Sequence, residues 1–220
     1  TVPRGLRRDT GPAPGGRSHG RLRAGGVGQQ HDYWGNSNLM PSTYFEDDQL
    51  APLTDEDDGI PGAFSSNFFF SRAMEYLKAR QDANEPCFVY LTPNVAHGPQ
   101  YRPPDARSGT TDRTATIENL DKNMGRLLEF LRTNGLADDT LLLFFTDNGG
   151  PSDLRGDKSD QYEGGHRVPC FIRWKNGGLG GTTNLSREVP ELTAHIDLLP
   201  LFLDLLNLHD VTNRSPLVPL

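Results

Sequence analysis

The chain has 220 residues, with 22 lysines and arginines against 29 aspartates and glutamates, so its formal net charge is −7. This length suits one large domain or one and a half, and it allows a hydrophobic core without disulfide staples. The longest apolar run, Leu141 to Phe145, has five residues, far short of the roughly 20 that a membrane helix needs. An acidic chain is also a poor partner for nucleic acid. We therefore expect no membrane span and no nucleic-acid interface.

The first 30 residues differ in composition from the rest of the chain. They contain six arginines, one aspartate, eight glycines and three prolines, and they have no aromatic residue. Such a segment buries too little apolar surface to offset the entropy lost on ordering. We interpret residues 1–30 as a disordered or foreign Arg/Gly/Pro-rich segment, and residues 31–220 as the part that folds.

Helices and strands alternate from about residue 64 onward. Apolar residues at helical spacing predict helices over residues 66–81, 114–134 and 196–206, with Ser66 as the N-cap of the first and Gly135 as the stop of the second. Short apolar runs predict buried strands at residues 87–91, 140–146 and 168–174. Such strands indicate an α/β fold with a parallel or mixed sheet covered on two sides. Ligands of these sheets bind beyond the carboxyl ends of the strands.

Two cysteines, Cys87 and Cys170, are present in the whole chain. They are too few for a disulfide scaffold or a thiolate zinc site. Each lies inside an apolar run, so we expect two buried free thiols.

The loop after the second predicted strand begins with Asp147, Asn148 and two glycines. A carboxylate beside an amide carbonyl supplies hard oxygen ligands suited to Ca²⁺ or Mg²⁺. The same Asp-Asn-Gly sequence is also an ordinary turn, and composition alone favours the turn. Its place at a strand's carboxyl end makes a cation site nearly as good an interpretation as a turn.

Three further residues fall where the sheet rule expects a site. Lys158 and Arg167 lie in a glycine-punctuated stretch that could hold an anion such as sulfate or phosphate, or they could be solvated surface charges. His97 follows the first predicted strand within Ala-His-Gly-Pro. A lone histidine is more often structural than catalytic, so both roles stay open for it.

Taken in order, four segments resemble the sulfatases. They are FVYLTPNVAHGP at 88–99, IENLDKNMGRLL at 117–128, NGLADDTLLLFFTDNGG at 134–150 and LRGDKSDQYEGGHRVPCFIRW at 154–174. The resemblance covers residues 59–208. It implies an alkaline-phosphatase-like sandwich, with a mostly parallel central sheet covered by helices and incomplete at its N-terminal side, that hydrolyses a small-molecule or glycan sulfate ester.

The resemblance also implies roles for individual residues. Asp147 and Asn148 match the pair that binds a divalent cation in the family, usually Ca²⁺. Lys158 matches the lysine that contacts the sulfate, and His97 matches the histidine that binds the sulfate or assists the leaving alkoxide. Glu163 and Arg167 also match the family motif, and we interpret them as structural anchors of the loop.

One family feature is missing from the chain. Sulfatases use a formylglycine nucleophile made from the Cys or Ser of a Cys/Ser-x-Pro-x-Arg motif, and no Cys or Ser here has a proline two positions later. We expect the nucleophile and an early aspartate pair to lie in a missing N-terminal part. The 220-residue chain alone is then an inactive fragment of a catalytic domain.

Two alternatives remain besides a sulfatase. The first is a phosphatase or phosphonate hydrolase of the same superfamily, which typically has further metal ligands where His97 and Lys158 stand. The second is a non-catalytic protein of the same fold that binds an anion or a sulfated ligand, and the missing nucleophile favours it. By resemblance, we expect the parent protein to be exported to a periplasmic, secreted or lysosomal location.

Overall fold

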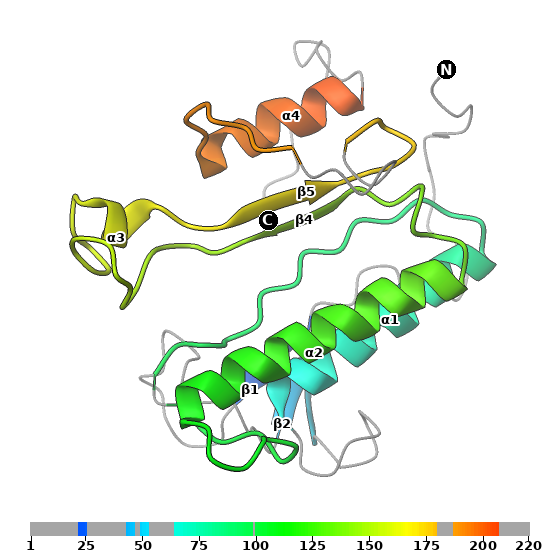
Figure 1. Ribbon diagram of the computed structural model, residues 1–220. Coiled ribbons are helices and arrows are strands. Elements are labelled where there is room, and N and C mark those ends of the chain that lie inside the picture. Colours follow the sequence, from blue (N-terminus) through cyan, green and yellow to red (C-terminus); the bar gives the residue numbers. More distant parts are fainter. Residues whose placement is uncertain are drawn as a thin grey trace. The chain divides into compact units, whose positions relative to one another are not determined.

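The computed structural model describes residues 64–98, 100–179 and 187–206, together with the backbone of three short strands, β1 (Leu22–Gly25), β2 (Thr43–Glu46) and β3 (Gln49–Pro52). The three strands form an antiparallel sheet in the order β1-β2-β3. The rest of the predicted segment 1–30 lies outside the described residues. The chain divides into two compact units, Thr1–Thr140 and Leu141–Leu220, which we describe in turn (Figure 1).

Helix α1 (Ser65–Asp82) opens the described part of the first unit. No glycine or proline interrupts its 18 residues. Pro86 follows the helix, and a proline disfavours the α conformation of the residue before it. The N-cap is Phe64, so the prediction of Ser66 was two positions late. Ser66 lies inside the helix and is fully buried. The apolar anchor of this end is a set of phenylalanines, since Phe64, Phe68 and Phe70 are each at most 1% exposed.

Helix α2 (Asp112–Thr133) runs beside α1 in Figure 1. The side chain of Thr111 accepts a hydrogen bond from the backbone N–H of Thr114 and caps the start. Gly135 adopts a positive φ of 70° just beyond the end, as a terminating glycine does. The Nε2 of Gln81, near the end of α1, donates to the carbonyl of Asn134 at 2.7 Å. The two helices therefore run in the same direction, and residues 83–98 and 100–111 belong to the connection from the end of α1 back to the start of α2 (Figure 1).

The buried face of α2 is more polar than its apolar stripe predicts. Leu127 and Leu131 are buried as expected, but Ile117 is 47% and Leu128 39% exposed. Their neighbours Thr116, Asn119 and Asn123 are buried instead. The buried residues recur every four positions along α2, from Ala115 through Asn119, Asn123 and Leu127 to Leu131. The interface with α1 therefore contains a polar cluster as well as leucines.

The buried strand predicted at residues 87–91 is not observed. No strand is assigned to this segment, and Phe88 and Tyr90 are 71% and 73% exposed. A strand needs a ladder of hydrogen bonds to a neighbouring strand, and the two sheets of the described residues do not include this segment. The predicted burial of the thiols was also wrong, since Cys87 and Cys170 are both free and exposed.

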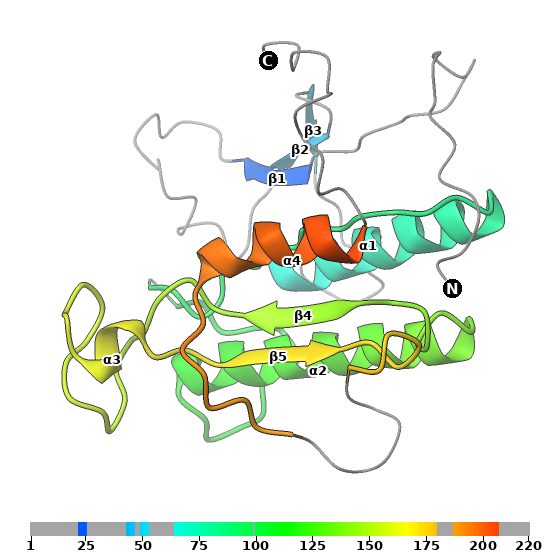
Figure 2. The ribbon, with the colours of Figure 1, turned by 90° about the horizontal axis from the view of Figure 1, so that it is seen from above.

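The second unit is built on a two-stranded ribbon. Strands β4 (Leu142–Phe145) and β5 (Cys170–Arg173) pair antiparallel, with Leu142 opposite Arg173 and Phe145 opposite Cys170. Figure 2 shows the two arrows side by side and oppositely directed. The rings of Phe144 and Phe171 lie 6.3 Å apart across the strands. All strand pairs of the described residues are antiparallel, whereas we expected a mostly parallel sheet with helices over it.

The last predicted helix is split into two pieces. A 3-10 turn, η1 (His195–Asp197), leads into α4 (Leu198–Leu205). The Asp197 carboxylate accepts the backbone N–H of Ala194 at 2.7 Å, which caps the turn. No residue of α4 is buried, and Leu199 is 65% exposed. None of the helices in the described ranges is both long and apolar enough to cross a membrane.

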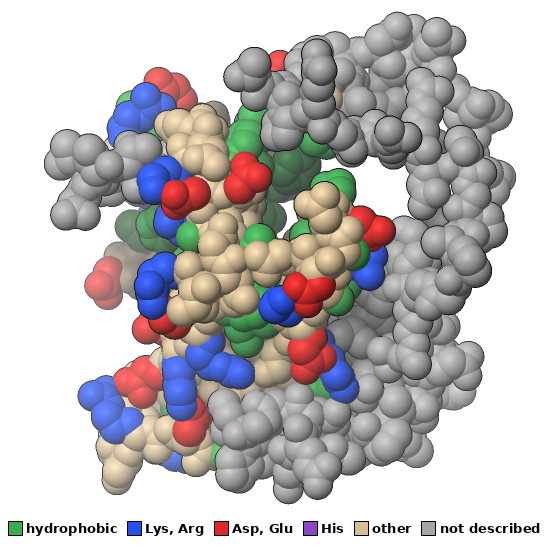
Figure 3. Space-filling view, turned by 90° about the vertical axis from the view of Figure 1, so that its right-hand side faces the viewer, with side chains coloured by type: hydrophobic (Ala, Val, Ile, Leu, Met, Phe, Trp, Pro, Cys, Tyr) green, Lys and Arg blue, Asp and Glu red, His purple; other side chains and the backbone are tan. Residues whose placement is uncertain are grey.

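Charged side chains are interspersed on the face shown in Figure 3, where basic and acidic groups alternate. The described helices carry short-range ion pairs of this kind, such as Arg72–Glu75 at 2.8 Å and Arg132–Glu129 at 2.5 Å. Exposed pairs of this kind contribute little to stability, because water and salt screen them. They solubilise the helices and add little to the fold.

Candidate functional site

The four predicted site residues fall in different parts of the fold. His97 belongs to the first unit, and Asp147, Asn148 and Lys158 belong to the second. Asp147 and Asn148 follow β4 directly, and Lys158 lies in the long connection from β4 to β5. Asp147, Asn148 and Lys158 therefore share one unit, and His97 lies in the other.

The Asp147-Asn148 pair forms a tight corner at the end of β4. The backbone N–H of Asn148 donates to Oδ1 of Asp147 at 2.9 Å. Asp147 is exposed and Asn148 half-buried. The next residue is tied to the far end of the connection, since the N–H of Gly149 donates to the carbonyl of Gly165 at 3.0 Å. The corner is a turn, and it also presents a carboxylate and an amide on neighbouring residues.

Lys158 stands on a second turn, formed by residues 157–160. The N–H of Asp160 donates to the carbonyl of Asp157 at 2.9 Å, and the N–H of Asp157 donates to Oδ2 of Asp160 at 2.8 Å. The N–H of Lys158 donates to Oδ1 of Asp157 at 2.7 Å. Both flanking carboxylates thus bond the backbone. The exposed ammonium of Lys158 has no ion pair with any residue that the structure describes.

The helix α3 (Glu163–His166) joins the two turns. Its Gly164 N–H donates to the carbonyl of Arg155 at 2.8 Å, while the guanidinium of Arg155 lies 3.6 Å from the ring centre of Tyr162. Gly164 and Gly165 are both buried. The connection is therefore a folded loop held around α3.

Glu163 and Arg167 behave differently from the anchors that we predicted. Their side chains pair with each other at 3.2 Å, one helical turn apart, and both are more than half exposed. His166 lies 3.6 Å from the other carboxylate oxygen of Glu163. In the described part of the loop, the glycine backbone makes the long-range contacts instead. The paired glycines at 149–150 and 164–165 were visible in the sequence, but only their contacts show this role.

His97 lies on a turn that fixes its ring. Its backbone N–H donates to the carbonyl of Asn94 at 3.1 Å, and Nδ1 lies 2.6 Å from the carbonyl of Gly98. A carbonyl oxygen only accepts, so Nδ1 carries the proton in this contact. Nε2 of this exposed residue is then left for another partner.

The oxygen donors of Asp147 and Asn148 suit a hard cation chemically, but they are few. Ca²⁺ takes about six to eight oxygen ligands. No group of three or more His, Cys, Asp or Glu side chains converges within the described ranges. The pair fits one part of a cation site, and most of the ligands would come from other groups.

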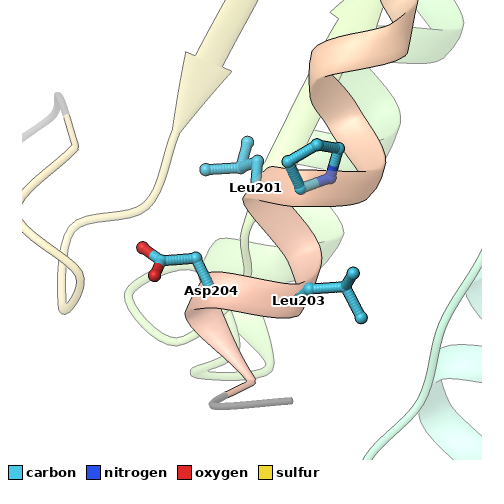
Figure 4. Close-up of a pocket in the computed structure, with 4 residues that line it drawn as sticks. Leu201, Leu203 and Asp204 are labelled. Atoms are coloured by element: carbon cyan, nitrogen blue, oxygen red, sulfur yellow. The ribbon is translucent and has the colours of Figure 1, made fainter. Parts of the chain in front are cut away.

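A surface hollow along α4 is the weaker candidate. It is lined by Pro200, Leu201, Leu203 and Asp204. Figure 4 shows Leu201 and Asp204 pointing to one side of the helix and Leu203 to the other. With one carboxylate and no second polar group, the hollow has no catalytic set. It also contains none of the predicted site residues.

Known proteins match much of the chain, and the matching family model spans the candidate site residues. The family model described as Sulfatase matches residues 15–208. A sulfatase of Formosa agariphila is 30% identical over 140 residues, which cover 52% of this chain and 25% of that protein. Arylsulfatase A of Homo sapiens is 31% identical over 153 residues, covering 64% of this chain and 29% of that enzyme. The matched part is thus about a quarter of each relative's length.

The solved structures agree on the fold. The crystal structure of the PsFucS1 sulfatase from Pseudoalteromonas sp. matches with a TM-score of 0.50 and 21% identity, over 62% of this chain and 30% of that one. At this identity the likeness concerns the fold alone. It is consistent with the alkaline-phosphatase-like class that we expected.

Proposed function

The chain belongs to the sulfatase family, and we propose that the protein is a sulfuric ester hydrolase that releases sulfate from an organic sulfate ester. One observation carries the proposal. The loop that follows Asp147 and Asn148 folds back through Gly149 onto α3, which also contacts the turn of Lys158. One short helix thereby contacts both the corner of Asp147 and Asn148 and the turn of Lys158, whose ammonium has no ion pair among the described residues. The substrate class is a small-molecule or glycan sulfate ester.

Asp147 and Asn148 are the proposed ligands of a divalent cation, Ca²⁺ or alternatively Mg²⁺. Such a cation would neutralise charge on the sulfate oxygens as the ester bond breaks. The backbone bond from Asn148 to Oδ1 of Asp147 holds that carboxylate at the end of β4. Its orientation is therefore set before any cation binds.

Lys158 and His97 are the proposed sulfate-contacting side chains. The ammonium of Lys158 would stabilise negative charge on a sulfate oxygen electrostatically. With Nδ1 of His97 bonded to the Gly98 carbonyl, Nε2 is the ring nitrogen left for a ligand, and it would donate a proton to the leaving alkoxide oxygen. The nucleophile is a formylglycine that this chain's own cysteines and serines do not provide in the required motif.

Ligand titrations followed by NMR test the assignment. We expect inorganic sulfate, added with millimolar Ca²⁺, to shift the amide signals of residues 147–150 and the side-chain signal of Lys158. Asp147→Ala should abolish the Ca²⁺ effect. The matched control is Asp153→Ala, which removes an exposed carboxylate of the same loop. Equal effects of both substitutions, or no shift in the wild-type chain, would refute the site.

An activity assay tests the inactive-fragment proposal separately. We expect the purified 220-residue chain not to turn over a chromogenic aryl sulfate, because it lacks the Cys/Ser-x-Pro-x-Arg motif. Its half-site should also bind Ca²⁺ more weakly than micromolar in calorimetry. Multiple turnovers, or micromolar binding that Asp147→Ala abolishes, would contradict this proposal.

The missing motif favours one second candidate, a non-catalytic protein of the same fold that binds an anion or a sulfated ligand. In that case sulfate would bind without hydrolysis in any longer form of the protein. Phosphate binding tighter than sulfate binding would instead favour a phosphatase or phosphonate hydrolase. For the hydrolase, we propose an exported location, periplasmic, secreted or lysosomal.

A further inference from the structure

Three glycines of the loop make backbone contacts that no other residue could make. A Cβ atom at Gly149 would lie 2.0 Å from the carbonyl oxygen of Gly164. At Gly164 it would lie 2.1 Å from the carbonyl oxygen of Gly156, and at Gly165 it would lie 2.2 Å from that of Asp160. These distances are below 3.0 Å, which Cβ atoms essentially never show. Because the opposing atoms are backbone, a side-chain rotation cannot relieve the overlap.

Two backbone hydrogen bonds accompany these close contacts. The N–H of Gly149 donates to the carbonyl of Gly165 at 3.0 Å, and the N–H of Gly164 donates to that of Arg155 at 2.8 Å. Helix α3 therefore touches the residue after the Asp147-Asn148 corner. Through Gly165 it also approaches the carbonyl oxygens of Asp157 and Asp160, in the turn on which Lys158 stands.

We propose that Gly164 and Gly165 are positioning residues, which fix the Lys158 turn relative to the Asp147-Asn148 corner. Close approach of two backbones without a side chain between them is a use specific to glycine. The inference rests on the proposed function for what the two ends bind. It adds that a cation at the corner and sulfate at Lys158 are coupled through the α3 glycines. A methyl group at Gly165 would displace the turn without touching any proposed ligand.

Hydrogen exchange measured by NMR tests the contact itself. We expect Gly165→Ala to raise the exchange rate of the Gly149 amide at least tenfold, while the β4–β5 amides keep their protection. The control is Gly125→Ala in α2, where no atom lies within 4 Å of the added Cβ. Unchanged exchange at Gly149 in Gly165→Ala would overturn the inference.

A coupling measurement separates positioning from a merely structural role. In the wild-type chain, Ca²⁺ should tighten sulfate binding at least fivefold, as coupled sites do. In Gly165→Ala, that factor should fall to about one while Ca²⁺ affinity changes less than threefold. A merely structural role would weaken both ligands together and keep their coupling. If neither ligand binds the wild-type chain, the proposed function fails, and the exchange measurement still decides the contact.

A second variant covers the case in which Gly165→Ala fails to fold. Asp160→Ala removes the 2.8 Å bond from the N–H of Asp157 to Oδ2 of Asp160 and introduces no clash. It loosens the same turn, so the coupling factor should again fall towards one while the β4–β5 amides stay protected. An unchanged coupling factor in Asp160→Ala would also overturn the inference.

Discussion

The α1–α2 pair and the loop from Asp147 to Arg167 are held together in different ways. In the helix pair, side chains make the contacts. The amides of Asn119 and Asn123 both donate to Oδ1 of Asn67, at 3.0 and 2.8 Å, inside the interface. In the loop, backbone meets backbone at glycines.

The difference shows how each region tolerates change. A side-chain interface can be repacked, because rotamers adjust to a substitution of similar volume. A backbone interface has no such freedom, so an added side chain must displace the backbone itself. The region that carries Asp147, Asn148 and Lys158 is of the second kind. Predicted ligands thus stand on the less adjustable part of the described structure.

The largest expected effect comes from Gly164→Ala. Its Cβ would meet the carbonyl oxygens of Gly156 and Arg155 at 2.1 and 2.8 Å, so we expect about 3 kcal/mol loss of unfolding free energy. The same substitution at Gly125, inside α2 with open space around it, should stabilise by about 1 kcal/mol through helix propensity. Urea unfolding of both variants measures the difference. Equal effects would show that the loop glycines have no special packing role.

Breaking the side-chain interface should cost less. Asn67→Ala removes the shared acceptor of two buried amides, and Asn123 keeps a further bond to Oδ1 of Asn119 at 3.1 Å. We expect a loss of about 2 kcal/mol in unfolding free energy, measured by urea unfolding. Glu75→Ala, at an exposed position inside α1, is the control and should change it by under about 0.5 kcal/mol. A loss larger than that of Gly164→Ala would reverse the comparison.

The helices and two strands could be predicted from the sequence, since β4 and β5 lie inside the predicted runs 140–146 and 168–174, but the antiparallel pairing of the strands could not. Helical spacing depends on neighbours within one turn, so α1 and α2 begin and end within two residues of the predicted limits. Burial of residues 87–91 depends on a partner strand far along the chain, which local apolarity does not specify. For the same reason, Asn119 and Asn123 were missed as core residues. Their burial follows from Asn67 on the facing helix.

The candidate site could be predicted in part. Asp147 and Asn148 do follow β4, because a strand of four apolar residues ends where polar residues begin. The anchoring role was predicted for Glu163 and Arg167, because both match the family motif. The structure gives the long-range loop contacts to glycines, whose function is to leave space. That role depends on atoms of other residues and cannot be predicted from composition.

Acidification should weaken the side-chain region through Asp105. Burial raises the pKa of this carboxyl, but the hydrogen bond and charge of Lys122, with a hydrogen bond from Asn119, outweigh it and hold the pKa below its ordinary value of 3.8. The stabilisation is complete above that ordinary value and is lost as pH falls through the lower folded value. We expect the unfolding free energy to fall more steeply below about pH 4 in the wild type than in Asp105→Asn. Parallel curves in urea unfolding at several pH values would contradict this.

The smallest expected effect concerns the turn of Lys158. Ser159 adopts a positive φ of 75°, which costs a residue with a Cβ about 1–2 kcal/mol. Ser159→Gly removes that cost but makes the unfolded chain more flexible, so we expect a net gain of about 0.5 kcal/mol in unfolding free energy. Asn84, also at positive φ (54°), is a residue that tolerates this conformation, and Asn84→Gly should leave stability unchanged. If Ser159→Gly instead destabilises the chain, the Ser159 side chain itself holds the turn. The backbone would then share its role in the loop with side chains, and the contrast with the helix pair would narrow.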